Sequence, residues 1–142
     1  MTRVMGLDLG TKRIGVAVSN GTLATPLTTI ERSGDVARDY ERIAALAAEE
    51  EATHVVVGVP INMDGTTGPA AQAALEEVDS LRSALPATVT IDTIDERLTT
   101  VTADRALRSA HPRSRVRGRR RTIDQTAAAV ILQAWIDRES QP

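Results

Sequence analysis

The sequence contains no cysteine and almost no aromatic residues. Without cysteine, disulfide bonds, zinc–thiolate sites and a cysteine nucleophile are all excluded. A single tryptophan, a single tyrosine and no phenylalanine leave valine, isoleucine, leucine and alanine to fill the core. The scarcity of aromatic side chains also argues against base stacking as the main mode of nucleic-acid binding.

Long apolar runs are missing as well. The opening segment, MTRVMGLDLG, lacks the apolar region of a secretory signal, and no stretch reaches the ~20 apolar residues needed to cross a membrane. We therefore expect a cytoplasmic protein without a membrane partner. Hydrophobic residues make up 42% of the 142-residue chain, which predicts one globular domain over residues 1–142 with a frayed tail at about 139–142.

Positive charge is concentrated rather than abundant. The net charge is −2, and sixteen of the seventeen basic residues are arginine, Lys12 being the only lysine. Arginine suits planar, bidentate contacts with phosphate. A cluster of six lies within nine residues: Arg113, Arg115, Arg117, Arg119, Arg120 and Arg121. This cluster predicts a local polyanion-binding site on a solvated loop.

The apolar periodicity predicts a sheet flanked by helices. Strands are expected at residues 3–9, 14–19, 23–30, 54–59 and 88–94, and helices at about 35–51, 70–84, 99–110 and 123–138. Pro26 favours an edge position for the third strand. The order β-β-β-α-β-α-β-α-α favours an α/β fold: a five-stranded mixed sheet with helices on both faces.

The helices are expected to be amphipathic, with Asp35 as the N-cap of the first. Inward positions are expected to be Val36, Tyr40, Ile43, Leu46 and Ala47 in the first helix, Ala74, Leu75, Val78, Leu81 and Leu85 in the second, and Ala127, Ala128, Ile131, Leu132 and Trp135 in the last. Asn20-Gly21 predicts a tight turn between the second and third strands.

Asp8 is out of place in an apolar strand, between Leu7 and Leu9. An ionised carboxylate is costly to bury unless it pairs, binds a metal or takes a proton. Asp8 is therefore a candidate metal ligand. The alternative is an aspartate that bonds to the backbone of the turn at Gly10.

Two further carboxylates, Glu96 and Asp124, stand at the ends of predicted elements. Glu96 follows the fifth strand, where open α/β sheets bind ligands; the alternative is a solvated loop charge, with its neighbour Asp95 paired to Arg97. Asp124 opens the last helix, where the helix dipole alone would favour it. However, Asp124 shares a helical face with Ala128, which points it toward the sheet.

Three carboxylates on separate elements match the needs of Mg²⁺, which prefers oxygen ligands. Two such ions can stabilise the attacking and leaving oxygens of a phosphodiester cleavage. Neither histidine has a metal-ligand spacing. His54 and His111 are therefore expected to be structural or exposed.

Other polar residues could hold a nucleic-acid strand near these carboxylates. Lys12 and Arg13 lie in the turn after Asp8, and Arg97 follows Glu96. A long loop at residues 60–69 precedes the second predicted helix, whose N-terminus would favour phosphate. The loop residues expected near the site are Asn62, Asp64, Gly65 and Gly68. The alternative for Lys12 and Arg13 is an ordinary polar turn, and the alternative for the loop is a plain connector between a strand and a helix.

Four segments of the chain together resemble a known family. They are GLDLGTKRIGVAVS (6–19), GVPINMDGTTG (58–68), DERLTT (95–100) and IDQTAAAVILQ (123–133). These resemble, in order and spacing, the motifs of the YqgF/RuvX family, whose members are described as pre-16S rRNA nucleases or Holliday junction resolvases. Asn20 departs from the family pattern, which commonly has aspartate there.

The resemblance implies a ribonuclease-H-like fold and a nuclease that depends on Mg²⁺ or Mn²⁺. It assigns the catalytic, metal-binding roles to Asp8, Glu96 and Asp124. It also implies processing of the 5′ end of pre-16S rRNA during ribosome biogenesis, so that precursor ribosomal RNA is the expected partner of a monomer or weak homodimer.

Three alternatives stay open. A DNA four-way-junction resolvase would use the same carboxylates but would need a symmetric dimer. The Asp8-Leu-Gly-Thr segment is also similar to the first phosphate loop of sugar kinases and Hsp70-like ATPases, which need two such domains. Finally, the chain could be a noncatalytic module of ribosome biogenesis or transcription.

Overall fold

The computed structural model describes residues 3–99 and 117–140, and for residues 117–125 it describes the backbone alone. The helix expected at 99–110 falls almost wholly outside the described residues, as do His111, Arg113 and Arg115. In the described part of the chain no helix is both long and apolar enough to cross a membrane.

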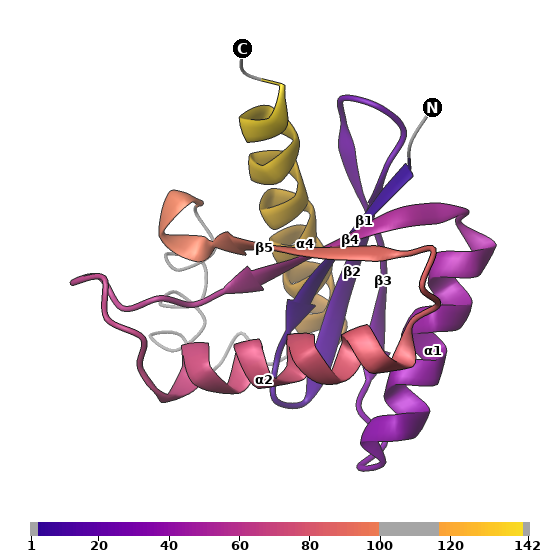
Figure 1. Cartoon of the computed structure of the whole chain (residues 1–142), viewed down its shortest axis with the longest axis horizontal. Coiled ribbons are helices and arrows are strands. Elements are labelled where there is room, and N and C mark those ends of the chain that lie inside the picture. Colours follow the sequence, from indigo (N-terminus) through magenta and orange to yellow (C-terminus); the bar gives the residue numbers. More distant parts are fainter. Residues whose placement is uncertain (1–2, 100–116, 141–142) are drawn as a thin grey trace.

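The described elements follow the predicted order closely (Figure 1). They are β1 (Arg3–Leu9), β2 (Arg13–Ser19), β3 (Ala24–Glu31), α1 (Val36–Glu49), β4 (Ala52–Val59), α2 (Pro69–Ala84), β5 (Thr90–Asp95), the short 3₁₀ helix η1 (Glu96–Leu98) and α4 (Arg117–Glu139).

The strands form one mixed sheet in the order β3-β2-β1-β4-β5. The first three strands pair antiparallel, and β4 and β5 add in parallel to β1 and to β4 respectively. Pro26 lies on the edge strand β3, as predicted, and the register shifts at its partner Ala17. Gly21 takes a φ of 102° in the turn between β2 and β3, which confirms the predicted turn.

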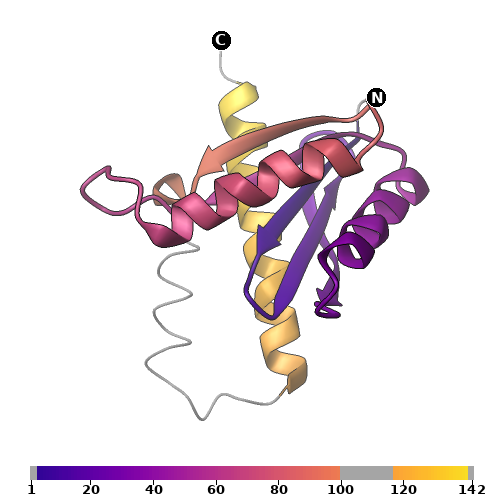
Figure 2. The same cartoon turned by 60° about the horizontal axis from the view of Figure 1, so that its bottom comes forward.

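Helices cover both faces of the sheet, as expected (Figure 2). On one face α1 and α2 bury Tyr40, Ile43 and Leu81 against the odd-numbered residues of β1. On the other face α4 buries Ala128 and Ile131 against alternate residues of the central strands. Successive residues of a strand therefore face different helices.

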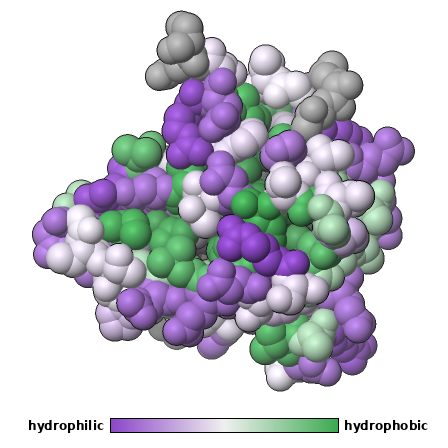
Figure 3. All heavy atoms as spheres, viewed as in Figure 1, coloured by the Kyte–Doolittle hydropathy of each residue, from purple (hydrophilic) through white to green (hydrophobic). Residues whose placement is uncertain are grey.

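Two expected core positions are wrong. Val36 is 51% exposed although it shares the helical face of Tyr40 and Ile43, because it is the first residue of α1 and lies at the end of that face. Leu75 is 39% exposed, on the flank of α2. Isolated apolar residues at a surface are ordinary, and in Figure 3 the apolar surface over α2 and β5 is broken up by hydrophilic residues. The N-cap is right, since Asp35 accepts a hydrogen bond from the backbone of Arg38.

The last helix is longer than predicted. It begins at Arg117 rather than near residue 123, so part of the arginine cluster is helical and not a loop. Arginine is a good helix former, and a charged run can lengthen a helix without adding an apolar stripe. At the other end α4 reaches Glu139, and the Ser140 hydroxyl donates to the Ile136 carbonyl, so the expected fraying does not begin at 139.

The close approach of α4 to the sheet depends on Gly6 in β1. A Cβ there would lie 2.7 Å from Leu132 Cβ and 3.0 Å from the Ala128 carbonyl oxygen. Both atoms belong to or adjoin the helix backbone, so neither can move aside alone. Gly6 is thus what allows backbone-to-backbone packing here.

We expect Gly6→Ala to destabilise the fold by about 1–3 kcal/mol, the usual cost of overpacking. Urea unfolding would measure this loss. Thr25→Ala, at an exposed position of β3, is the control and should change stability by less than about 0.5 kcal/mol. Equal stability of Gly6→Ala and the wild-type chain would contradict the packing described.

Candidate active site

Asp8 lies near the carboxyl end of β1 and is only 2% exposed. Alternation along β1 places it on the same side as Gly6, which is the side that α4 covers. The pairing Asp8↔Gly15 places it opposite a residue without a side chain. The sequence therefore puts a buried carboxylate between the sheet and the last helix, at the edge where the parallel strands end.

Glu96 reaches the same place from the outer strand β5. Its side chain is 1% exposed, and its Oε1 lies 2.7 Å from where a Cβ of Gly58 would stand. Gly58 belongs to β4, the strand between β1 and β5. In the parallel register Leu7 pairs with Val57, so Gly58 comes level with Asp8. The missing side chain of Gly58 is thus the space through which Glu96 extends inward.

Asp95 fixes how η1 starts and hence the direction of Glu96. Its Oδ1 accepts the backbone N–H of Arg97 at 2.9 Å, which caps the short helix. Its Oδ2 accepts Nε and Nη2 of the same arginine, at 2.9 and 2.7 Å. The Arg97 guanidinium hydrogen bond lowers the pKa of Asp95, so this pair stays ionised. The pairing that belonged to the alternative interpretation is thus confirmed, but the same interpretation made Glu96 a solvated loop charge, which is wrong because Glu96 is buried.

Asp8 and Glu96 line one open cavity of about 700 Å³ at this edge of the sheet. The turn between β1 and β2 contributes Lys12, which is exposed, and Arg13, which is half-buried. The start of α2 forms the opposite wall. The cavity thus combines cationic side chains, which can bind a phosphodiester, with carboxylates, which can bind a divalent cation.

The loop predicted to lie near the site is held mainly by its own polar groups. Asn62 Nδ2 donates to Thr66 Oγ1, and Asp64 accepts from the backbone and the hydroxyl of Thr66. None of Asn62, Asp64, Gly65 and Gly68 lines the cavity of Asp8. Gly65 instead borders a separate hollow with Asp95 and Arg97.

Asp92, in the middle of β5, is a carboxylate that stays outside the site. Its Oδ2 accepts Trp135 Nε1 at 2.7 Å and Arg138 Nη2 at 3.3 Å. It therefore anchors the C-terminal half of α4. The ring of Trp135 also lies 6.1 Å from that of His54, which fits the structural role expected for this histidine.

The third predicted ligand, Asp124, lies within α4, and its side chain is outside the described set. Among the side chains that are described, no three carboxylates or histidines form a group able to hold a metal ion. Because α4 starts at Arg117, Asp124 is not in its first turn. The alternative explanation of this aspartate by the helix dipole is therefore wrong.

Sequence reasoning missed Gly58 as a site residue. The signal that could have found it is a lone glycine in an apolar strand, which often marks a close approach of another group. Sequence reasoning also missed Arg32 and Glu77, which line the cavity. Nothing in the pattern of an exposed helix face separates Glu77 from its neighbour Glu76.

The sequence is similar to a known protein family and to named bacterial proteins. A model of the RuvX family, described as "Holliday junction resolvase", matches residues 2–138. A Myxococcus xanthus protein named "Putative pre-16S rRNA nuclease" is 49% identical over 142 residues, covering 99% of this chain and 91% of the relative. A protein of the same name from Thermoanaerobacter pseudethanolicus is 45% identical, covering 96% and 97%.

Among solved structures, Thermus thermophilus RuvC in complex with a Holliday junction substrate superposes with a TM-score of 0.59. The two chains are 18% identical, and the match covers 99% of this chain and 97% of RuvC. At that identity the likeness concerns the fold alone. It confirms the predicted ribonuclease-H-like, α/β fold.

Proposed function

Because the chain belongs to the RuvX family, we propose that it is a divalent-metal-dependent endonuclease that processes the 5′ end of pre-16S rRNA. The relatives named above carry the ribosomal RNA part of this proposal. The observation that carries the nuclease part is the convergence of Asp8 and Glu96 across Gly58 in one open cavity.

The helical register supports Asp124 as the third carboxylate. The α4 helix runs antiparallel to β1, since Gly6 faces Ala128 and Leu132 while the two chain ends lie at the same end of the molecule (Figures 1 and 2). From Ala128 back to Asp124 the helix advances ~6 Å. From Gly6 to Asp8 the strand advances ~6.6 Å in the same direction. This register supports the proposal that Asp124 comes level with Asp8 on the helix face that covers the sheet.

The donor set suits Mg²⁺ or Mn²⁺. Carboxylate oxygens from Asp8, Glu96 and Asp124 are hard ligands, and the described part of the site offers no sulfur or imidazole. Two ions would be held by these three carboxylates together with the substrate phosphate. When bound, they supply the positive charge that stabilises the attacking and leaving oxygens of phosphodiester cleavage.

The chain's own groups would hold the strand beside the carboxylates. Lys12 and Arg13 contribute positive charge from the β1–β2 turn, at the rim of the cavity. Arg97 contributes less, because its charge is matched by Asp95. The helical arginines Arg117, Arg119, Arg120 and Arg121, with Arg113 and Arg115, are proposed to bind backbone phosphates. Such contacts give affinity without reading sequence.

A second candidate is a resolvase of four-way DNA junctions, favoured by the description of the family. The same carboxylates would cut, but two chains would have to act across a two-fold axis. RNA is preferred because the relatives at 45–49% identity are named for it.

The decisive experiment compares two labelled substrates, a precursor 16S rRNA end and a four-way DNA junction, with Mg²⁺ present. We expect cleavage of the RNA alone, abolished by EDTA and restored by excess Mg²⁺ or Mn²⁺. Cleavage of the junction alone, at paired positions, would assign the second candidate. If neither is cut, catalysis is rejected and a noncatalytic binding module is favoured.

A further inference from the structure

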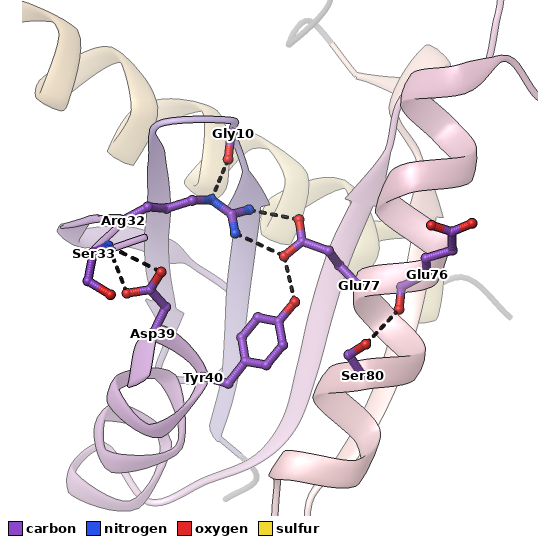
Figure 4. Close-up of polar contacts among 8 residues, drawn as sticks. All are labelled: Gly10, Arg32, Ser33, Asp39, Tyr40, Glu76, Glu77 and Ser80. Atoms are coloured by element: carbon purple, nitrogen blue, oxygen red, sulfur yellow. Dashed lines mark hydrogen bonds and ion pairs between the residues drawn. The ribbon is translucent and has the colours of Figure 1, made fainter. Parts of the chain in front are cut away.

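A second polar cluster contains Arg32, Tyr40 and Glu77, of which Arg32 and Glu77 line the same cavity (Figure 4). Arg32 follows β3, Tyr40 belongs to α1 and Glu77 to α2. Arg32 Nη2 and Nη1 donate to the two carboxylate oxygens of Glu77 at 2.7 and 3.0 Å. The Tyr40 hydroxyl donates to Glu77 Oε2 at 2.7 Å. We call these three residues the Arg32 cluster.

The Arg32 cluster is attached to the turn that carries the candidate phosphate-binding cations. Arg32 Nε donates to the Gly10 carbonyl at 2.8 Å, and its backbone N–H donates to the Lys12 carbonyl at 2.9 Å. One residue thus holds two carbonyls of the segment between β1 and β2. Asp8 lies just before this segment, and Arg13 just after it.

Glu77 sets the orientation of the guanidinium in this arrangement. A bidentate pair fixes the plane of an arginine side chain, and this plane directs Nε at the Gly10 carbonyl. Burial, followed by the hydrogen bond to Glu77, raises the pKa of the Tyr40 phenol. The phenol therefore stays protonated and remains a donor to the carboxylate.

We propose that Glu77 is a positioning residue of this site: by holding Arg32 against the Gly10 carbonyl, it fixes the turn that presents Lys12 and Arg13 to the phosphates of the substrate. The substrate part of this inference rests on the proposed function. The structural part concerns the turn alone and can be measured without substrate.

The first test is Glu77→Gln, which keeps the size of the side chain and removes its charge. We expect KM for the labelled RNA to rise about tenfold, the order of one lost charge-assisted contact, with kcat changed less than KM. Glu76→Gln is the matched control, because it removes the same charge from an exposed side chain that points away from Arg32 (Figure 4). Tyr40→Phe removes one donor to Glu77 and should raise KM by a smaller factor.

A double-mutant cycle separates positioning from a general loss of stability. Lys12→Ala should weaken RNA binding in the wild-type chain and in Glu76→Gln by the same factor. In Glu77→Gln its effect should be smaller, because Lys12 is already misplaced. Equal effects of Lys12→Ala in all three backgrounds would overturn the proposal.

Hydrogen exchange of the peptide spanning residues 9–14, in the free protein, tests the turn directly. Glu77→Gln should speed its exchange, and Glu76→Gln should not. Unchanged exchange, or faster exchange with an unaltered KM, would refute positioning by Glu77. A wild-type chain that bound neither RNA nor DNA would instead defeat the proposed function, and the exchange comparison would still decide whether Glu77 holds the turn.

Discussion

Asp8→Asn is expected to reduce cleavage of the precursor RNA by at least about 10²–10³-fold, the usual cost of removing one group that stabilises charge in a transition state. The physical reason is that asparagine keeps the shape of the side chain and loses the charge that a divalent cation needs. Single-turnover cleavage with saturating protein would measure the loss, because it separates the chemical step from substrate binding.

Metal binding provides an independent measure of the same variant. Mn²⁺ should raise the melting temperature of the wild-type chain, since a ligand that binds only the folded state stabilises it. In Asp8→Asn this rise should disappear, while the metal-free melting temperature stays within a few degrees of wild type. An active Asp8→Asn variant, or one that Mn²⁺ stabilises as strongly as wild type, would exclude Asp8 as a metal ligand.

Gly58→Ala is expected to abolish most activity although it substitutes no charged residue. The new methyl group would lie 2.7 Å from Glu96 Oε1 and 2.6 Å from Ile131 Cδ1, so both side chains must move. A displacement of about 1 Å in a catalytic group can cost about 10²-fold in rate. The same crowding should cost about 1–3 kcal/mol of stability, measured by urea unfolding.

Ile131→Val provides a matched way to separate these two effects. It removes Cδ1, the isoleucine atom nearest the added methyl group. The double variant Gly58→Ala/Ile131→Val should therefore recover part of the lost stability, since Cγ1 still lies 3.0 Å from the added methyl group, whereas the clash with Glu96 remains and activity should stay low. Recovery of both properties would mean that packing of α4, and not the position of Glu96, accounts for the loss.

Much of the fold could be predicted because local patterns dictate it. The apolar run at 54–59 gave β4, the proline at 26 marked an edge strand, and Asp35 capped α1. The start of α4 could not be predicted in this way. Its first turns carry arginines without apolar periodicity, so the pattern began only at the part of the helix that packs on the sheet.

In the candidate site, too, only the residues marked by a local pattern could be predicted. Asp8 stood out because its neighbours in the strand are apolar. That Glu96 turns inward depends on the strand order and on an absent side chain in β4, neither of which is a local property. Glu77 belongs to the surface pattern of α2, and its link to Arg32 joins positions 45 residues apart.

The position of β4 between β1 and β5 has a consequence for the timing of activity. The two buried carboxylates meet only after β4 has paired with β1 and β5 has paired with β4. Parallel pairings of this kind close long loops and form late in folding. On the proposed function, a chain still emerging from the ribosome would carry Asp8 without Glu96 and Asp124, and would be unable to cut the RNA around it until synthesis had passed α4 and the sheet was complete.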